Sequence, residues 1–467
     1  MTTSRRRPPP PWAGCALLAA AAALAGGCAL SPDYRVPETA PVPLAYKEAS
    51  PGWVPAAPAD ATERGPWWEM FQEPGLNALA ARIDVSNQNV AAAVAAYAQA
   101  RAMVQEQRGA LLPTVTLDGG ASRNRNSRND QASLGAAWEP DVWGRLRAAA
   151  LAGDAALQAS AADLASAQLA AQGELAANYL SLRQVDIQKT LVDSTLAGFE
   201  KSLQIARNRY AASVAPKADV LQAETQLANT RAEAIGLALQ RAQLEHAIAV
   251  LVGESPSQFS LPRQTGEARI PEVPPELPSQ LLQRRPDIAA AERRVAVANE
   301  QIGIARSAYF PSFSLSASRG FGASRLADLF DAGSGLWSLG LSAAQTLFDG
   351  GRTRAQVEGA KAAWEESVAR YRQTVLQAFQ GVEDQLAQIR ILAEQQVQRE
   401  QAARFADEAE QQVLNRYRAG QVGYADVIAA QSTALGARRA LSQAVGDRQV
   451  AAVALVQALG GNWTAPR

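Results

Sequence analysis

The sequence predicts a membrane protein of mixed α and β structure, in which short strands form part of a barrel wall and very long helices pair as coiled coils. Three observations carry this prediction. One unit occurs twice along the chain, each copy has a long proline-free stretch with an apolar stripe, and each copy has two short segments that alternate apolar and polar residues. Because a stripe at helical spacing and a strict alternation have different periods, the first predicts helix and the second strand.

The internal repeat consists of units of about 200 residues. Asn89–Pro113 aligns without a gap on Asp287–Pro311, and from Arg145 onward the offset becomes 207, so that Arg145 matches Arg352. The same offset then holds for Asn208-Arg209-Tyr210 with Asn415-Arg416-Tyr417, for Asp219 with Asp426, and for Gly253 with Gly460. Units of this size are far longer than solenoid repeats, so we infer a duplication that gives the fold a pseudo-symmetry.

The N-terminus has the features of a bacterial export signal. Arg5–Arg7 precede the apolar run Ala16–Ala25, which is too short to span a bilayer, and small residues follow. The five residues ending at Cys28 resemble a lipobox, although Ala25 stands where Leu is usual, and Ala29 is not the Asp of lipoproteins held at the inner membrane. We expect N-palmitoyl and S-diacylglycerol groups on Cys28 and no cofactor beyond this lipid. The alternative is an ordinary signal peptide with a coincidental cysteine.

Proline is distributed unevenly and marks the expected boundaries. Prolines crowd before residue 75 and between Pro256 and Pro286, where they favour extended connectors, and are absent between Pro140 and Pro216 and between Pro311 and Pro466. The predicted organisation is a signal peptide at 1–27, an extended lipidated segment at 28–75, a first repeat at 76–255, a Pro-rich connector at 256–286, a second repeat at 287–461 and a short tail at 462–467.

The proline-free stretches predict paired helices of unusual length. An apolar stripe follows steps of three, four or seven residues, and all six positions are apolar in both copies, which favours coiled-coil packing. The stripe comprises Leu157, Ala161, Leu164, Ala171, Leu175 and Leu182, with Trp364, Val368, Tyr371, Ala378, Val382 and Ile389 as counterparts. A helix from Arg147 to Ala212 would be about 100 Å long at 1.5 Å per residue.

Alternating segments precede each long helix and predict strands. Pro311–Ser318 and Trp337–Ala343 alternate apolar residues with Ser or Gly, and the weaker first copy has Val115 with Leu117, then Leu134–Trp138, around a polar loop at Arg123–Asp130. This alternation is typical of an outer-membrane barrel wall. Four strands cannot close alone, since single-chain membrane barrels need at least about eight, so the barrel must use several chains. A soluble hairpin sheet packed on the helices is the alternative.

Residues for conventional catalysis are nearly absent. The chain has two cysteines, of which Cys15 lies inside the expected signal peptide, and one histidine, His246, in a helical stretch. No zinc-protease, nucleophile-elbow or P-loop motif occurs. Lys and Arg equal Asp and Glu in number, which gives no general attraction to nucleic acid. We therefore predict neither an enzyme nor a metal site.

The order of proline, strand, loop, strand, Gly-Arg and long helix, present twice, resembles the TolC family of outer-membrane efflux factors, in particular its lipidated branch typified by OprM and NodT. The motifs that carry the resemblance are Cys28–Tyr34, Trp67-Trp68 with Phe71, Leu112-Pro113, Arg284–Asp287, Phe310-Pro311 and Phe348–Arg352. The resemblance implies a homotrimer with a 12-stranded outer-membrane β-barrel, four strands per chain, that continues into a periplasmic α-helical coiled-coil barrel. Such ducts receive drugs or other small molecules from an inner-membrane pump, here expected to be of the RND type, through a periplasmic adaptor.

In this family the two helix-to-helix turns form a closed periplasmic tip, which makes their residues gate candidates. The resemblance places Asp426 on one of the family's aperture aspartates, whereas the second such position is Ala429. The gate candidates are Asp426, Asp219, Tyr417 and Tyr210, and the turn residues are Gly420 and Pro216. Either aspartate also suits the first turn of a helix, where the dipole favours it, and Tyr417 also suits plain helix packing. Because Ser213 replaces Gly420 in the first copy, we expect the two turns to differ.

Two other functions stay open at this point. The same fold permits an exit duct for type I protein secretion, although lipidation and the short sequence after Trp463 favour small-molecule efflux. A non-transporting coiled-coil envelope lipoprotein would account for the helices and the anchor, but it predicts no alternating strands. Heavy-metal cargo lacks support because the expected strands contain no cluster of Met or His.

Overall fold

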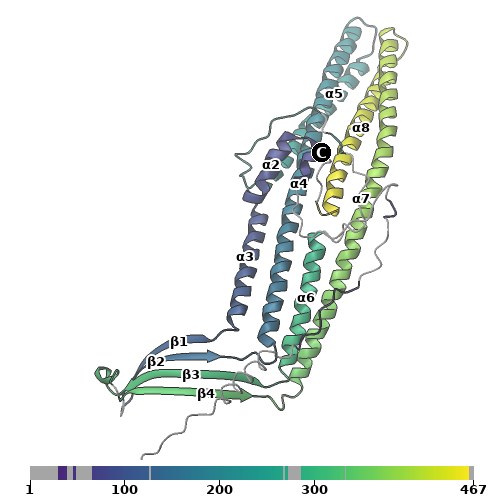
Figure 1. Cartoon of the computed structure of the whole chain (residues 1–467). Helices are drawn as coiled ribbons and strands as arrows, with labels where there is room; N and C mark the ends of the chain where they lie inside the picture. The colour runs from purple at the N-terminus through teal and green to yellow at the C-terminus, as the bar shows by residue number, and fades with distance from the viewer. Residues whose placement is uncertain are drawn as a thin grey trace, which may run out of the picture. The chain divides into compact units, whose positions relative to one another are not determined.

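Secondary structure follows the predicted duplication (Figure 1). The computed structural model describes residues 30–38, 46–48, 66–125, 128–266, 269–271, 285–331 and 333–461, so Cys28, the expected signal peptide and the expected tail lie outside the described residues. The first copy contains η1 (Trp67–Phe71), α2 (Pro74–Ser86), α3 (Gln88–Gly109), β1 (Thr114–Arg123), β2 (Arg128–Trp138), α4 (Arg145–Ala211) and α5 (Lys217–Leu251). The second contains α6 (Pro286–Ser307), β3 (Ser312–Ala323), η3 (Leu326–Asp328), β4 (Gly335–Ala344), α7 (Arg352–Arg418) and α8 (Tyr424–Ala458).

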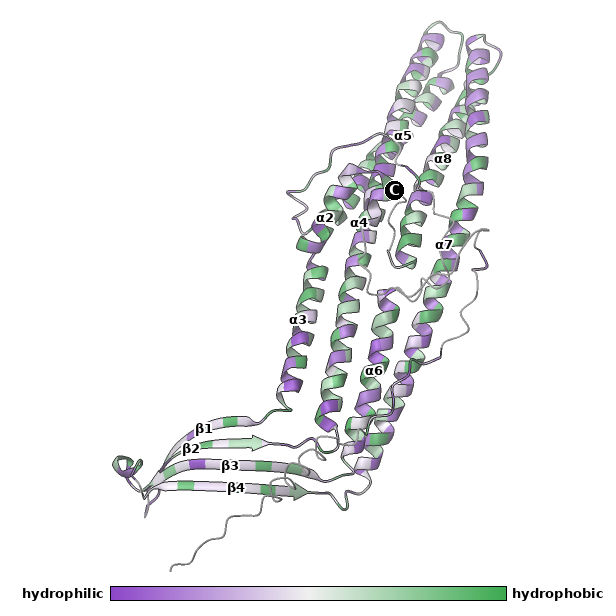
Figure 2. Cartoon of the chain, viewed as in Figure 1, coloured by the Kyte–Doolittle hydropathy of each residue, from purple (hydrophilic) through white to green (hydrophobic). Residues whose placement is uncertain are grey.

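The corresponding long helices have equal lengths in the two copies. Helices α4 and α7 each have 67 residues, and α5 and α8 each have 35. Polar and apolar residues are interleaved along all four (Figure 2), as expected for helices that bury a stripe against partners rather than a whole surface. Within the described part of the chain, no helix has both the length and the hydropathy of a membrane-crossing segment. The predicted internal duplication is confirmed.

The chain divides into two compact units, each of which draws on both copies. One unit contains residues 30–38, 96–162 and 290–373 with the sheet, and the other contains the remaining described residues from 46 onward. Contacts within the second unit repeat at the offset of 207. Arg231 pairs with Glu200 at 2.8 Å, and their counterparts Arg438 and Asp407 pair at 2.7 Å. The duplication therefore extends to the side-chain contacts that hold each helix pair together.

The four strands form one antiparallel sheet in the order β1-β2-β3-β4. The Ser residues of β3 and β4 face each other across the register, with Oγ–Oγ distances of 2.7 Å for Ser314 and Ser342 and 2.8 Å for Ser318 and Ser338. On the opposite face, Trp337, Leu339 and Leu341 are 70–80 % exposed. A soluble sheet packed on the helices would cover this apolar face, so that alternative is wrong.

The polar loop predicted between the first two strands is too long. Strand β1 continues to Arg123 and β2 begins at Arg128, which pair with each other at the end of the hairpin. Asp130 was placed in the loop, but it lies within β2, is 2 % exposed, and accepts a hydrogen bond from Arg128 at 2.9 Å. The hairpin extends through polar residues because its ladder is made by backbone groups, which pair whatever side chains they carry.

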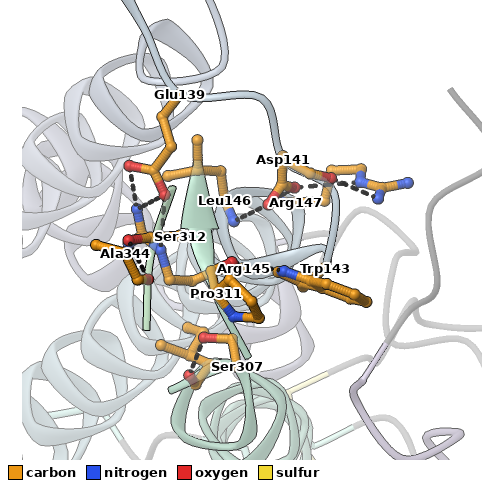
Figure 3. A network of polar contacts seen from close by, with 11 residues as sticks. Glu139, Asp141, Trp143, Arg145, Leu146, Arg147, Ser307, Pro311, Ser312 and Ala344 are labelled. Carbon is orange, nitrogen blue, oxygen red and sulfur yellow. Dashed lines mark hydrogen bonds and ion pairs between the residues drawn. The ribbon is translucent and has the colours of Figure 1, made fainter. Parts of the chain in front are cut away.

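An aspartate caps the start of each long helix where it leaves the sheet. The carboxylate of Asp141 accepts hydrogen bonds from the backbone N–H groups of Leu146 and Arg147 at 3.0 and 2.9 Å (Figure 3). Asp349 does the same for Gly351 and Thr353 at 2.9 and 2.8 Å. The hydrogen bond from the Thr353 hydroxyl lowers the pKa of Asp349 most, and the two backbone bonds add to this effect. A charged cap at a helix N-terminus satisfies otherwise unpaired donors, so both long helices begin at defined residues.

Residues 30–38, here called the N-terminal strap, lie against α6 in the first unit. Ser31 donates a hydrogen bond to Glu300 at 2.7 Å, and Asn299 donates one to the carbonyl of Pro32 at 2.8 Å. A Cβ atom at Gly303 would stand only 2.8 Å from the Cα atom of Ser31. The close approach of the strap to the helix therefore depends on the missing side chain at this glycine.

Candidate gate at the helical turns

The turns that join α4 to α5 and α7 to α8 have the same backbone structure. In the first, the N–H groups of Ser213 and Val214 donate to the carbonyls of Tyr210 and Arg209, both at 2.9 Å. In the second, the N–H groups of Gly420 and Gln421 donate to the carbonyls of Tyr417 and Arg416, at 3.0 and 2.9 Å. This is a common hydrogen-bonded ending of a helix.

A left-handed residue closes each turn, with φ of 73° at Gly420 and 57° at Ser213. The two turns therefore have the same backbone conformation although Ser213 stands in place of Gly420. A serine tolerates the left-handed region at a cost of about 1 kcal/mol, which the turn's hydrogen bonds offset. The turns differ in the side chains that they present.

The helices that follow the turns begin differently. At α8 the Asp426 carboxylate accepts a hydrogen bond from the backbone N–H of Gly423 at 3.1 Å. At α5 the equivalent residue is Pro216, which has no N–H to donate to Asp219. Asp426 thus has a local structural role as a helix cap, while its side chain stays exposed to solvent.

Tyr417 makes one of the contacts between the two copies. It is 3 % exposed, and the Arg209 guanidinium lies over its ring with the central carbon 4.7 Å from the ring centre. An Arg209 Nη also donates a hydrogen bond to the Tyr417 carbonyl at 2.8 Å. Arg209 comes from the end of α4 and Tyr417 from the end of α7, so this contact joins the first helix pair to the second.

Burial of the neighbouring aromatic rings changes their acidity. The ring centres of Tyr417 and Tyr424 are 5.4 Å apart. Burial raises the pKa of Tyr417, Arg209 opposes the increase, and Asp219 adds to it. Burial also raises the pKa of Tyr424 to about 12, with smaller contributions from Tyr417 and Asp219. Both rings therefore stay neutral at physiological pH, and Asp219 lies close enough to influence each of them.

Tyr210 holds the position equivalent to Tyr417 but has a different environment. Its side chain is 47 % exposed, whereas that of Tyr417 is buried. Of the four gate candidates, the structure brings Asp219 and Tyr417 together and leaves Tyr210 and Asp426 exposed. The sequence did not predict a role for Arg209 at the candidate gate. Arg209 belongs to the Asn-Arg-Tyr triplet that recurs after 207 residues, but the alignment alone does not show which of the two arginines contacts a tyrosine.

A groove opens between the first turns of α5 and α8. It has a volume of about 410 Å³ and is lined by Leu221, Gln222, Thr225, Gln226, Ala425 and Ile428. Leu221 is 53 % exposed. Uncharged polar and apolar side chains make up the whole lining. Such a lining suits the binding of a protein surface better than the binding of an ion. In the part of the chain described by the structure, no cluster of His, Cys, Asp and Glu could hold a metal ion.

Two copies of a strand hairpin and a long helix pair, with an uncovered apolar face on the sheet, define an outer-membrane channel with a helical extension. A model of the outer membrane efflux protein family matches residues 79–254 and 277–461. The chain belongs to this family.

Curated relatives match over almost their whole length. The chain is 33 % identical over 452 residues to the pyoverdine export outer membrane protein OpmQ of Pseudomonas aeruginosa, covering 91 % of this chain and 94 % of OpmQ. It is 32 % identical over 463 residues to the toluene efflux pump outer membrane protein TtgC of Pseudomonas putida, covering 94 % of each. The solved outer-membrane channel OprN superposes with a TM-score of 0.83 at 30 % identity, covering 93 % of this chain and 100 % of OprN.

These matches establish the fold and the location of the protein. The chain has the fold of trimeric outer-membrane channels, a β-barrel with a helical tunnel built by internal duplication, as predicted. It lies in the outer membrane and extends into the periplasm, and it serves as an efflux exit channel. The members of this family are channels rather than enzymes.

Proposed function

We propose that this protein is the exit duct of a tripartite efflux pump, closed at its periplasmic tip by contacts between the two helix pairs. The pump would consist of a homotrimer of this chain, a periplasmic adaptor and an inner-membrane pump of the RND type. Drugs or other small molecules would pass through passively. The observation that carries the proposal is the contact between Arg209 and Tyr417, because it joins the ends of two helix pairs that would have to separate for the tip to open.

The homotrimer is supported by the edges of the sheet. Strands β1 and β4 stand at the two ends of the order β1-β2-β3-β4, and among the described residues each pairs on one side only. In lipid, unpaired backbone groups at such edges are strongly unfavourable. Three copies would join β4 of each chain to β1 of the next, which gives a closed barrel of twelve strands.

An adaptor is supported by the groove between α5 and α8. Its lining is uncharged. Leu221, near the start of α5, and Val214, in the turn before α5, are both exposed. An amphipathic helix or hairpin can dock its apolar face in such a groove. The adaptor would then contact both helix pairs at once, so its binding could bias the contact between Arg209 and Tyr417.

The gate proposal includes Asp426, Asp219, Tyr417 and Tyr210. Three copies of an exposed carboxylate around a pore would favour cations and repel one another when ionised. Tyr417 would hold the helix pairs together, and Asp219 would act on it electrostatically. Tyr210, which is exposed, would contribute only through neighbouring chains.

Membership of the lipidated branch, with acyl groups on Cys28, completes the proposal. Its support is the lipobox-like sequence ahead of Cys28. One acyl chain binds a membrane only marginally, which is why a multiply acylated cysteine is an effective tether. The relatives are named for pyoverdine export and for toluene efflux, and the inner-membrane pump would select the cargo of this protein.

The gate is tested by conductance of the purified trimer in planar lipid bilayers. We expect Asp426→Ala to raise the ion leak because it loses the cap of α8. Both Asp426→Ala and Asp426→Asn should weaken cation selectivity because the carboxylates around the pore are lost. The Asn variant keeps an oxygen that can accept the bond from the Gly423 N–H, and so it separates the charge from the helix cap. A leak in the Ala variant alone assigns Asp426 to the cap, and unchanged conductance in both removes it from the gate.

A further inference from the structure

A basic pocket lies where the sheet meets α6 and α7. It has a volume of about 690 Å³, and we call it the junction pocket. Its charged lining includes Arg306, Arg354 and Lys361, its aromatic lining is Tyr309 and Phe310, and the first residues of the N-terminal strap close one side. None of these groups belongs to the helical turns of the gate.

The junction pocket has an excess of positive charge. Glu358 is its one acidic lining residue and pairs with Lys361 at 2.9 Å. This contact, with a smaller contribution from Arg354, lowers the pKa of Glu358. Among the described residues, Arg354 forms no ion pair, and Arg306 donates a hydrogen bond to the carbonyl of Leu30 at 3.3 Å. Two guanidinium groups therefore face the pocket without a carboxylate of their own, which favours an anionic ligand.

The strap gives the pocket a preformed wall. Leu30 and Ser31 line the pocket, and Ser31 is held against α6 by its bond to Glu300 and by the close approach at Gly303. A ligand therefore meets a wall that is ordered before it binds, which lowers the entropic cost of binding.

The aromatic side of the pocket marks a membrane interface. Tyr309 and Phe310 lie just before Pro311, which precedes β3, and are 48 % and 37 % exposed. Phe310 stacks on Trp143 with 4.7 Å between ring centres. The Trp143 indole N–H donates a hydrogen bond to the carbonyl of Pro311 at 2.7 Å (Figure 3). Aromatic residues of this kind form girdles at the two rims of outer-membrane barrels. Since the helices extend into the periplasm, this rim meets the inner leaflet.

We propose that the junction pocket binds the phosphoryl headgroup of an anionic phospholipid from the inner leaflet of the outer membrane. The guanidinium groups of Arg306 and Arg354 and the ammonium group of Lys361 would contact the phosphate oxygens. Tyr309 and Phe310 would lie along the glycerol and the first acyl carbons. The inference depends on the outer-membrane location of the barrel and not on the state of the gate. A bound lipid would link the helices, the strap and the bilayer at one point.

The experiment titrates the detergent-extracted trimer with short-chain phosphatidylglycerol and counts bound lipids by native mass spectrometry. We expect saturable binding that weakens about 25-fold in the double variant Arg354→Gln/Lys361→Gln, since one cation near a membrane surface changes lipid affinity about fivefold. The matched control Arg101→Gln/Arg399→Gln removes two exposed cations that do not line the pocket, and it should bind as the wild type does. Glu358→Gln should tighten binding about fivefold, a gain that misfolding cannot produce.

Two further titrations decide the nature of the ligand. Phosphatidylcholine of the same chain length should bind at least about fivefold more weakly, because its headgroup has no net charge. Inorganic phosphate should not displace phosphatidylglycerol at equal concentration. Equal binding by the double variant and the control overturns the proposal, and equal competition by inorganic phosphate replaces the lipid with a soluble anion. Conductance of the same variants should stay at the wild-type value, so failure here leaves the exit-duct proposal intact.

Discussion

Replacement of Arg209 by methionine tests the contact that joins the two helix pairs. Methionine keeps most of the side-chain length and a similar helix propensity, but it has neither a charge nor a donor. The variant removes the 2.8 Å hydrogen bond to the Tyr417 carbonyl and the cation–π contact at 4.7 Å. We expect Arg209→Met to shift the tip toward its open state.

The size of the shift follows from these two contacts. A hydrogen bond from a charged group contributes about 1.5–3 kcal/mol, and a cation–π contact about 0.5–2 kcal/mol. Because Arg209 is only half-buried, solvent screening favours the low end of the combined range, about 2 kcal/mol per chain. At 1.4 kcal/mol for each factor of ten, the ratio of open to closed tips rises about 30-fold when one chain opens alone.

Single-channel recording in planar bilayers measures this ratio, and the chain offers a matched control two residues away. Arg207 lies on the same helix and donates to Glu224 of α5 at 2.7 Å, a contact within the first helix pair. Arg207→Met should therefore leave the open probability unchanged. An open probability in Arg209→Met no higher than in Arg207→Met would refute the assignment of the gate contact to Arg209.

Two further predictions concern the strap and the anchor. Gly303→Ala places a Cβ atom against the Cα of Ser31, so proteolysis of the strap should accelerate several-fold. The control Gly359→Ala in α7, whose Cβ would meet nothing within 4 Å, should leave the rate of proteolysis unchanged. Equal rates in the two variants would show that the strap does not depend on Gly303. Cys28→Ser behind a replaced export signal should weaken membrane anchoring but leave a barrel that inserts into the membrane. Membrane fractionation and heat-modifiability measure these two properties. Complete loss of membrane association would contradict the assignment of the strands to a barrel.

Much of the fold was predictable because it depends on periodicity and punctuation. The offset of 207 predicted two copies with long helices of equal length, and Arg145 and Arg352 mark the observed starts of those helices. The alternation in the second copy predicted β4 closely and the start of β3, but β3 continues past Ser318 to Ala323. The first hairpin was predicted too short, since Arg123 and Arg128 form ladder pairs through backbone groups that side-chain polarity does not report.

Less of the candidate gate was predictable. The need for a left-handed residue at Gly420 follows from the chemistry of helix ends, and it is visible in one sequence. The difference between Tyr417 and Tyr210 is not visible, because equivalent positions in two copies have the same local sequence but face different neighbours. Arg209 was part of the aligned triplet, yet its partner lies 208 residues away on another helix.

The sequence by itself determined the duplication, because the two copies can be compared residue by residue. It also determined the helix and strand types, because these depend on residues close together in the chain. It predicts, in addition, an export signal ahead of Cys28. Only the tertiary structure decided which of two equivalent tyrosines is buried beneath an arginine and which cations meet at the junction pocket. Such pairings depend on the packing of whole helices. The duplication makes the two copies alike in sequence, but it cannot give equivalent residues the same neighbours. The lipobox-like sequence predicts that the chain is tethered to a membrane, and the four-stranded sheet shows how the chain would span it.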